Sequence, residues 1–338
     1  MKKLKIGIIG VGRLGYEHAC NIANRVPGSK LVAIADANFD RAKQVAEELG
    51  VTAVYNDPKA LCADPNVEAV AIITNTASHV EMIKIAMDAG KHVFCEKPLA
   101  DTVEKCKEAE AIIAAHPELT FMLGFMRRYD HSYQVAKKKM ENGDIGDVIL
   151  VRCYSQDPIS IIEGTLEYAP RSGGQFIDMS IHDFDLIRWL TGSEVKELWA
   201  TGGCYEFKQY KDWDDGDNVS GLMKMENDAM AFFFAGRAAA HGSHVETEIV
   251  STRGTLRIAS VPTDSLVEVM SQHGVCRECY QDFITRWHDA YITEIEEFCD
   301  CVATGRKATP GVIDGTQSTK IAFRCKESFL TDKKLTLE

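Results

Sequence analysis

The chain has 338 residues, of which 45% are hydrophobic and 26% are charged, a balance typical of a globular protein with about two domains. Its formal net charge is −12, which argues against nucleic acid or an anionic membrane as a main partner, because both favour a basic surface. No stretch approaches the ~20 apolar residues of a membrane span and the short N-terminal apolar run lacks a cleavage site, so we expect a cytoplasmic protein.

The first 125 residues alternate between short apolar runs and amphipathic segments. The runs are nearly continuous in apolarity, as in strands that are covered on both faces. Gly50 and Gly90 follow two of the amphipathic segments, where glycine commonly ends a helix. The alternation predicts a doubly wound parallel sheet with right-handed crossovers. The expected strands are 4–10, 31–36, 53–55, 69–74, 92–97 and 120–125, and the expected helices are 14–25, 40–49, 77–89 and 103–115.

Beyond residue 125 the pattern changes to longer strand-like runs with few helices between them. Consecutive strands joined by short turns favour a mainly antiparallel sheet. We therefore predict an α/β domain over residues 1–125 and an α+β domain with a large open sheet over residues 126–338. The expected strands of the second domain are 148–155, 195–204, 219–226, 230–238, 246–251, 255–259 and 266–271, and its helices are 132–141, 178–190, 286–304 and 313–330.

Eleven cysteines are scattered along the chain, mostly inside apolar runs, and are typical of small buried side chains rather than of disulfides. His273, Cys276 and Cys279 have partial zinc-ligand spacing, but the sequence offers no clear second half of such a site. We predict free thiols and no metal, and the sequence leaves any other role of the two cysteines open.

The segment GVGRLG, residues 10–15, has the spacing G-x-G-x-x-G between a predicted strand and a predicted helix. Gly10 permits a tight turn, Gly12 lets a pyrophosphate approach the backbone, and Gly15 lets the helix pack closely on the sheet. Asp36 ends the second strand, where an acid can bind the adenosine ribose hydroxyls and would repel a 2′-phosphate. Because no arginine follows before Arg41, the sequence favours NAD over NADP.

Further cofactor candidates surround this signature. Strand carboxyl ends form the ligand crevice of such sheets, and the fourth strand is followed by polar side chains that we assign to the nicotinamide side. Helix capping by Thr76 or Ser78 is the structural alternative there. The additional candidates are Arg13 and Leu14 in the turn, Ala37 after the acid, and Thr74, Asn75 and His79 after the fourth strand.

The run HVFCEKPLAD, residues 92–101, places Glu96, Lys97 and Pro98 directly after a buried strand. Together with GVGRLG, Asp36 and the antiparallel second half, the segment AGKHVFCEKPLA (residues 89–100) resembles the Gfo/Idh/MocA oxidoreductase family over essentially the whole chain. The resemblance implies a Rossmann domain, an open-sheet domain for substrate binding and oligomerisation, and an active site between them. It also implies a homotetramer that assembles through the open sheet face.

In that family the lysine of the Glu-Lys-Pro motif lies beside the nicotinamide and donates a hydrogen bond to the reacting oxygen. The resemblance therefore implies a catalytic and substrate-binding role for Lys97 and a cofactor-site role for both Glu96 and Lys97. It also implies a Lys97–Pro98 bond that is often cis, which would aim the lysine into the cleft.

Asp178 and His182 lie four residues apart at the start of a predicted helix, so we expect their side chains to share one face. His182 can accept a proton near neutral pH, and Asp178 can orient it or bind a neighbouring hydroxyl. A helix-cap interaction is the plainer alternative. In the family, matching Lys, Asp and His residues form the catalytic trio, which supports catalytic and substrate-binding roles for both residues.

The resemblance is closest to the inositol 2-dehydrogenases, which implies NAD-dependent oxidation of a ring hydroxyl of myo- or scyllo-inositol to the inosose. Arg127 is a candidate substrate contact, and a structural salt bridge is its alternative. Asp157 is placed to read a ring hydroxyl, but Ser-Gln-Asp-Pro departs from the His-Arg-Asn-Pro of myo-inositol oxidisers, so the isomer stays open. Tyr291, one turn after Trp287, is a further pocket candidate, although core packing is commoner for such pairs.

Two rival functions remain. The first is another NAD(P)-dependent sugar or polyol dehydrogenase of the same family, which would use the same cofactor and lysine. The second is a non-catalytic dinucleotide-sensing regulator built on this fold. The presence of both Lys97 and His182 favours the enzyme.

Overall fold

A computed structural model describes residues 2–272 and 274–337, so the candidate zinc ligand His273 lies outside the described residues. The chain forms two compact units. The first runs to Tyr129 and also includes His288–Thr319, and the second contains Asp130–Trp287 and the chain from Lys320 onward. The sequence placed one boundary after residue 125. The later segment joins the first unit because α11 (His288–Thr304) packs against η1 (Asn21–Arg25) and η3 (Met126–Tyr129).

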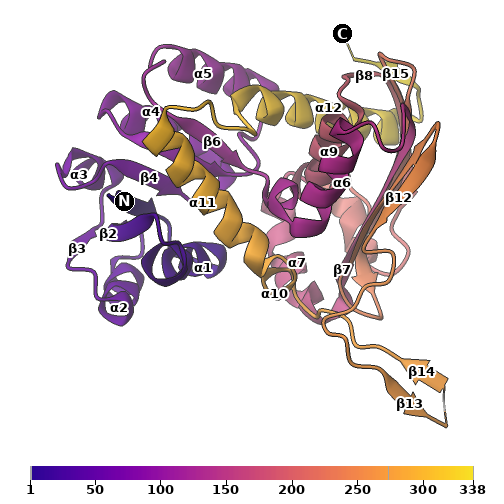
Figure 1. Cartoon of the computed structure of the whole chain (residues 1–338), viewed down its shortest axis with the longest axis horizontal. Helices are drawn as coiled ribbons and strands as arrows, with labels where there is room; N and C mark the ends of the chain where they lie inside the picture. The colour runs from indigo at the N-terminus through magenta and orange to yellow at the C-terminus, as the bar shows by residue number, and fades with distance from the viewer. Residues whose placement is uncertain (1, 273, 338) are drawn as a thin grey trace. The chain divides into compact units, whose positions relative to one another are not determined.

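The first unit is built on a parallel sheet with strand order β3-β2-β1-β4-β5-β6, which confirms the predicted doubly wound architecture (Figure 1). The strands are β1 (Leu4–Ile9), β2 (Ser29–Ala35), β3 (Ala53–Tyr55), β4 (Ala69–Ile72), β5 (His92–Glu96) and β6 (Phe121–Gly124). The helices between them are α1 (Arg13–Cys20), α2 (Phe39–Leu49), α3 (Pro58–Ala63), α4 (His79–Asp88) and α5 (Val103–Ala114). Helix α3 was not predicted, because it is short and carries little periodic pattern.

Local signals set the ends of these helices. The Asn38 side chain accepts the backbone N–H of Arg41 at the start of α2, and Thr102 does the same for Lys105 at the start of α5. Gly50 ends α2 in a left-handed conformation with φ +68°, as the sequence predicted. Most residues of β1, β2, β4, β5 and β6 are buried, whereas the edge strand β3 is half-buried, so burial of Val, Ile and Ala from both faces holds the middle of this sheet.

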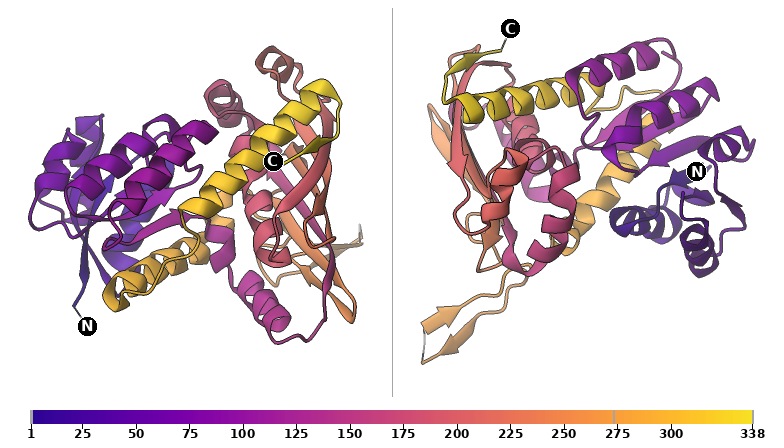
Figure 2. Two further views of the ribbon diagram at one scale, coloured as in Figure 1. Left: turned by 90° about the horizontal axis from the view of Figure 1, so that it is seen from above. Right: turned by 180° about the vertical axis from the view of Figure 1, so that it is seen from behind.

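The second unit contains a sheet with strand order β12-β11-β7-β10-β9-β8-β15 (Figure 2). Its pairs are antiparallel except β7 with β10, so the prediction of a mainly antiparallel sheet is confirmed. The strands are β7 (Val148–Pro158), β8 (Val195–Gly203), β9 (Asn218–Met225), β10 (Met230–Ala239), β11 (His244–Ser251), β12 (Gly254–Ile258) and β15 (Leu335–Thr336).

Helices accompany this sheet. Burial alternates along β11, as expected for a strand with one covered face, and α9 packs against β7. The α-helices are α6 (His131–Glu141), α7 (Ile162–Tyr168), α8 (Gln175–Asp178), α9 (Ile181–Thr191), α10 (Phe283–Arg286) and α12 (Val312–Thr331), and η6 (Lys208–Trp213) is a 3-10 helix. Helix α12 begins in the first unit and ends in the second.

Two predicted elements of the second unit were wrong in detail. The expected strand 266–271 is not part of the large sheet, because β13 (Val269–Ser271) pairs with β14 (Gly274–Cys276) in a separate hairpin that extends away from it (Figures 1 and 2). The expected helix 178–190 is broken. Helix α8 ends at Asp178, and α9 starts only at Ile181, because the backbone N–H groups of Met179 and Ser180 both turn back to the Gln175 carbonyl.

Within the described ranges, no helix combines the length and the apolarity needed to cross a bilayer. Every cysteine lies in those ranges, and all of them are free. Cys276 is exposed in the hairpin, whereas most of the others are buried, as the sequence suggested.

Candidate active site

The glycine turn after β1 has the geometry that a dinucleotide pyrophosphate needs. Gly10 has φ +92°, and a Cβ at this position would lie 2.4 Å from the Ile73 carbonyl oxygen. A Cβ at Gly15 would lie 2.1 Å from the Gly10 carbonyl oxygen, so α1 can pack this close only with glycine there. A Cβ at Gly12 would meet no atom within 4 Å. The flank of Gly12 is therefore open, at the point where α1 begins at Arg13.

Asp36 is tied to this turn. Its Oδ2 accepts the Val11 backbone N–H at 2.7 Å, and its Oδ1 accepts the Asn38 N–H at 2.7 Å. These bonds orient the carboxylate beside the turn. Arg41, which the sequence analysis treated as too distant, also reaches the turn: its Nε donates to the Val11 carbonyl at 3.2 Å, and its guanidinium lies 5.1 Å from the centroid of the Tyr16 ring.

Of the candidate residues after β4, His79 supports the segment of the motif lysine, whereas Asn75 is exposed. The Thr74 hydroxyl lies 2.8 Å from the Ser78 hydroxyl. His79 is buried, with Nδ1 2.7 Å from the Pro98 carbonyl oxygen and Nε2 3.2 Å from the Thr74 carbonyl oxygen. Burial lowers the pKa of His79, and a neutral imidazole donates from one nitrogen only, so we assign the donated bond to the shorter contact with Pro98. His79 thus fixes the chain just after Lys97.

Glu96 holds the same segment from the other side. Its Oε2 accepts the Lys97 backbone N–H at 3.0 Å, and its Oε1 lies 2.9 Å from His18 Nε2. The Lys97–Pro98 peptide bond is cis. The lysine at the end of β5 is therefore on a backbone that Glu96 and His79 restrain on both sides, which is more support than a surface lysine requires.

The second unit brings two predicted acids together on a residue that the sequence analysis missed. Arg237 of β10 is only 6% exposed, and it donates from Nη1 to Asp157 Oδ2 at 2.7 Å and from Nη2 to Asp178 Oδ2 at 2.5 Å. Burial alone would lower the pKa of Arg237, but Asp178 and then Asp157 raise it above its usual value. The Arg237 guanidinium is therefore charged and bonded to two carboxylates. A single arginine inside the apolar run MAFFFAGRAAA was the available signal.

A third acid lies behind the glycine pair that precedes α8. Gly174 has φ +95°, and a Cβ there would lie 3.2 Å from the Asp215 carboxylate. Asp215 Oδ2 accepts the Gln175 backbone N–H at 2.8 Å, and burial raises the pKa of Asp215. In the structure the group that approaches Gly174 is a side chain of the protein itself.

The remaining candidates are distributed between the units. His182 is buried in α9, one residue before Asp183, whose Oδ1 accepts the Ser155 hydroxyl at 2.7 Å. Because α8 and α9 are separate, the expectation that Asp178 and His182 share a face of one continuous helix is wrong. Arg127 is buried in η3, and the buried Tyr291 packs edge-on against His18 at 5.3 Å in the first unit, so its predicted substrate role stays a prediction.

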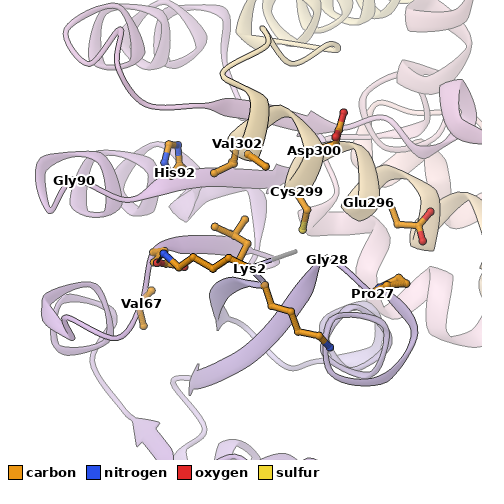
Figure 3. A pocket seen from close by; sticks show the side chains of 14 residues that line it. Lys2, Pro27, Gly28, Val67, Gly90, His92, Glu296, Cys299, Asp300 and Val302 are labelled. Atoms are coloured by element: carbon orange, nitrogen blue, oxygen red, sulfur yellow. Dashed lines mark hydrogen bonds and ion pairs between the residues drawn. The ribbon is translucent and has the colours of Figure 1, made fainter.

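A pocket of about 830 Å³ lies in the first unit, and none of these residues lines it (Figure 3). It is lined by Leu4 at the start of β1, by Val67, by His92 at the start of β5, and by Cys299 and Val302 of α11. These strand positions are at the amino ends of the parallel sheet, whereas the glycine turn and Lys97 follow carboxyl ends. Ligands bind at the carboxyl ends of such sheets, so we do not assign the pocket to the active site.

Comparison with known proteins decides the family. Residues 4–125 match the model described as "Oxidoreductase family, NAD-binding Rossmann fold", and residues 133–257 match the GFO/IDH/MocA C-terminal domain. The chain is also 33% identical over 97% of its length to the scyllo-inositol 2-dehydrogenase (NAD(+)) of Bacillus subtilis, covering 94% of that protein. The chain belongs to the GFO/IDH/MocA oxidoreductase family. The predicted NAD-binding Rossmann domain is thereby confirmed.

Solved structures of other GFO/IDH/MocA proteins are similar over the whole chain. The scyllo-inositol dehydrogenase of Lactobacillus casei, solved with bound NAD(H) and scyllo-inositol, has 39% identity and a TM-score of 0.96, with 99% of each chain covered. The myo-inositol 2-dehydrogenase of Lactobacillus plantarum has 38% identity and a TM-score of 0.96, with 100% of each chain covered. The two have nearly equal similarity to this chain, so similarity alone does not choose between the isomers.

The residues of this family member fit the dinucleotide. The open flank of Gly12 and the start of α1 fit the pyrophosphate of NAD. The oriented Asp36 carboxylate fits the ribose hydroxyls. Arg41 supplies a cation at the same turn, where it donates to the Val11 carbonyl.

Proposed function

We propose that this protein is an NAD-dependent inositol 2-dehydrogenase that oxidises a ring hydroxyl of myo- or scyllo-inositol to the inosose. The observation that carries the proposal is the Arg237 cluster, in which one buried guanidinium holds Asp157 and Asp178 as two ionised, partly exposed acceptors. A polyol ring offers several hydroxyl donors in fixed directions, and oriented carboxylates suit such donors. Relatives at similar identity carry inositol dehydrogenase names.

Lys97 is proposed to donate a hydrogen bond to the reacting oxygen. A charged donor that is already oriented stabilises negative charge on that oxygen at little reorganisation cost. Glu96 and His79 restrain the backbone on either side of this residue, which supports a role that depends on position.

His182 is proposed to take the proton of the reacting hydroxyl, with Asp178 binding a neighbouring hydroxyl or orienting the substrate. Bound NAD supplies the acceptor for the hydride that leaves the same carbon. The loss of one proton and one hydride converts the secondary alcohol to a ketone. His182 is buried in α9, where water does not compete for its proton.

Asp157 is proposed to read one further ring hydroxyl. An aspartate accepts hydrogen bonds only, whereas the asparagine of the myo-inositol pattern also donates. In this structure Oδ2 of Asp157 is engaged by Arg237, which leaves Oδ1 as the oxygen proposed to accept from substrate. The ratio of activities on the two isomers therefore tests this residue directly. Arg127 and Tyr291 stay proposed substrate contacts, and both are buried in the first unit.

The cofactor site is proposed to consist of the glycine turn with Arg13, Leu14 and Ala37, the residues Thr74, Asn75 and His79, and the Glu96–Lys97 motif. Asp36 supports NAD over NADP, because its carboxylate is oriented beside the turn. His79 would act indirectly, since its side chain is buried against Pro98.

The test is reduction of NAD or NADP by the purified protein with myo-inositol, scyllo-inositol, the other inositol isomers and glucose, followed by absorbance of the reduced cofactor. NAD reduction with an inositol supports the proposal. Activity on glucose or another sugar alone would keep the mechanism and replace the substrate. NAD binding without reduction by any alcohol would favour the non-catalytic sensor.

Assembly into a homotetramer is also proposed. Apolar side chains are exposed both in the hairpin segment, including Leu266 and Met270, and on the outer face of the large sheet, including Leu222 and Met230. Exposed apolar surface of this kind commonly marks a protein–protein interface. Light scattering of the native protein tests the stoichiometry, and a monomer would contradict it. We further propose a cytoplasmic location, which the free cysteines support.

A further inference from the structure

Three buried ionisable side chains cluster behind the Lys97 segment in the first unit. They are His18 on α1, Glu96 at the end of β5 and Glu294 on α11, and their exposed fractions are 0%, 4% and 0%. His18 Nε2 lies 2.9 Å from Glu96 Oε1 and 4.0 Å from Glu294 Oε1. The proposed reaction assigns nothing to His18 or Glu294, although both lie next to the residue that holds Lys97.

The surroundings of this cluster are apolar. The His18 ring lies 5.5 Å from the Phe94 ring and 5.3 Å from the Tyr291 ring. Gly124 leaves the room that the Glu96 carboxyl occupies, since a Cβ there would lie 3.1 Å from it. Charges in such a place are poorly solvated, so the cluster tolerates few uncompensated ones.

The hydrogen bonds indicate where the charge lies. Glu96 is the carboxylate with hydrogen-bond partners, since it accepts the Lys97 N–H and lies 2.9 Å from His18 Nε2. Among the described residues, neither oxygen of Glu294 has a hydrogen-bond partner. Burial, and then the charge of Glu96, raises the pKa of Glu294 well above its usual value. Glu294 therefore carries a proton and faces the hydrogen-bonded pair of His18 and Glu96 as a neutral acid.

The other ionisable groups on η1 and η3, which pack against α11, supply no cation that would compensate a negative charge on Glu294. Tyr129 of η3 is a phenol whose pKa is raised, by burial first and then by nearby carboxylates. Arg128, also on η3, pairs with Asp314 at 2.9 Å, and Arg25 of η1 lies 3.7 Å from Glu17. A second negative charge in the cluster would therefore compete with Glu96 for His18.

We propose that His18 and Glu294 are positioning residues for Lys97 that act through Glu96. His18 holds the Glu96 carboxylate in the place where it accepts the Lys97 backbone N–H. Because Glu294 is protonated, Glu96 is the one carboxylate of the cluster that carries a negative charge. When Glu294 ionises, it draws His18 away from Glu96, and the Lys97 segment loses its anchor. This inference rests on the proposed function, because Lys97 is the residue proposed to contact the reacting oxygen.

The first test compares the pH profile of kcat in the native protein and in Glu294→Gln, which keeps the shape and is neutral at every pH. The native kcat falls on the alkaline side as Glu294 loses its proton. In Glu294→Gln the plateau of kcat extends at least about one pH unit further to the alkaline side, because the ionising group is removed. The KM values change less than about twofold. Glu297→Gln, a control on the same helix whose partner is Arg306, leaves the profile unchanged. Identical profiles for the native protein and Glu294→Gln overturn the proposal.

His18→Gln tests the link to Glu96. Its kcat falls about tenfold, the effect of a misplaced catalytic group, while NAD affinity stays within about twofold. An unchanged kcat in a folded His18→Gln protein overturns the proposal. If this variant does not fold, the Glu294→Gln comparison still decides.

Two measurements need no turnover, so they separate failure of this inference from failure of the proposed function. Because the folded pKa of Glu294 is raised, native stability is lost as pH rises from the unfolded value of about 4.3 toward the folded value, and Glu294→Gln lacks this loss. As pH rises, the Tm of the native protein therefore falls relative to the Tm of Glu294→Gln. A difference between the two Tm values that stays constant with pH overturns the proposal. The rate at which an amine reagent labels Lys97, divided by the rate for Lys105, changes at alkaline pH in the native protein and not in Glu294→Gln. An equal change of this ratio in the two proteins overturns the proposal.

Discussion

Replacement of Arg237 by methionine is the most direct test of the substrate-side cluster. Arg237 is buried and bonds Asp157 and Asp178 with separate nitrogens, so Arg237→Met leaves two neighbouring carboxylates without their cation. Breaking a buried ion pair from one side costs about 3–5 kcal/mol. The two aspartates keep 20% and 18% of their side-chain surface exposed, so water screens them in part and we take about 3 kcal/mol. For a domain of this size that lowers Tm by about 6–12 °C.

Thermal unfolding of the purified variant measures this loss. Arg257→Met is the matched control, because Arg257 pairs with Glu248 but is largely exposed, and removing such a pair costs at most about 1 kcal/mol. Adding Asp157→Asn to Arg237→Met removes one of the two uncompensated charges and restores part of the Tm. The KM for the polyol rises in Arg237→Met far more than the KM for NAD.

Equal Tm values for Arg237→Met and Arg257→Met would refute the reasoning, because the buried guanidinium would then stabilise nothing that an exposed one does not. A double variant that is no more stable than Arg237→Met would refute the charge argument in particular. In that case loss of side-chain packing, and not two unpaired carboxylates, would account for the change.

Three further predictions concern the nucleotide side. Lys97→Ala lowers kcat by about 10²–10³-fold while NAD affinity, measured by titration, changes little; near-normal turnover would contradict the proposed role. Asp36→Ala weakens NAD binding by about tenfold and reduces the ratio of NAD affinity to NADP affinity, because the oriented carboxylate is lost while Arg41 remains at the turn. An unchanged ratio of the two affinities would count against this assignment. Gly15→Ala places a Cβ against the Gly10 carbonyl and lowers Tm through about 1–3 kcal/mol of strain; a wild-type melting curve would mean that α1 shifts freely.

The sequence located the turn and the strand-end residues where the signal was local. The glycine turn, Asp36 and the Glu-Lys-Pro motif each lie within a few residues of a strand end, and parallel strands bring their carboxyl ends to one edge. His79 was found by the same logic, but its side chain is buried against Pro98, since α4 begins at His79 and turns it toward the sheet. Periodicity located the residue and did not reveal its direction.

The break between α8 and α9 shows a second limit. A period of 3.6 residues treats Asp178 and His182 as neighbours on one helix. The chain instead ends one helical turn at Asp178, whose carboxylate binds Arg237, and starts the next helix at Ile181. The Met179 and Ser180 N–H groups both turn back to the Gln175 carbonyl, which a period of 3.6 residues does not record, so the helix boundary was misplaced.

The sequence by itself determined the parallel sheet of the first unit, the glycine turn and the lysine after β5, because apolar runs, glycine spacing and strand ends are properties of short segments. Only the tertiary structure decided which side chains meet across long separations. Arg237 lies 80 residues from Asp157 and 59 from Asp178. It reaches Asp157 because β10 pairs with β7 in parallel, with a register irregularity between Gly236 and Ala239, and it meets Asp178 at the end of α8. Glu294 reaches His18 because α11 packs on the first unit. Such meetings depend on burial and strand register over the whole chain, which no short pattern records.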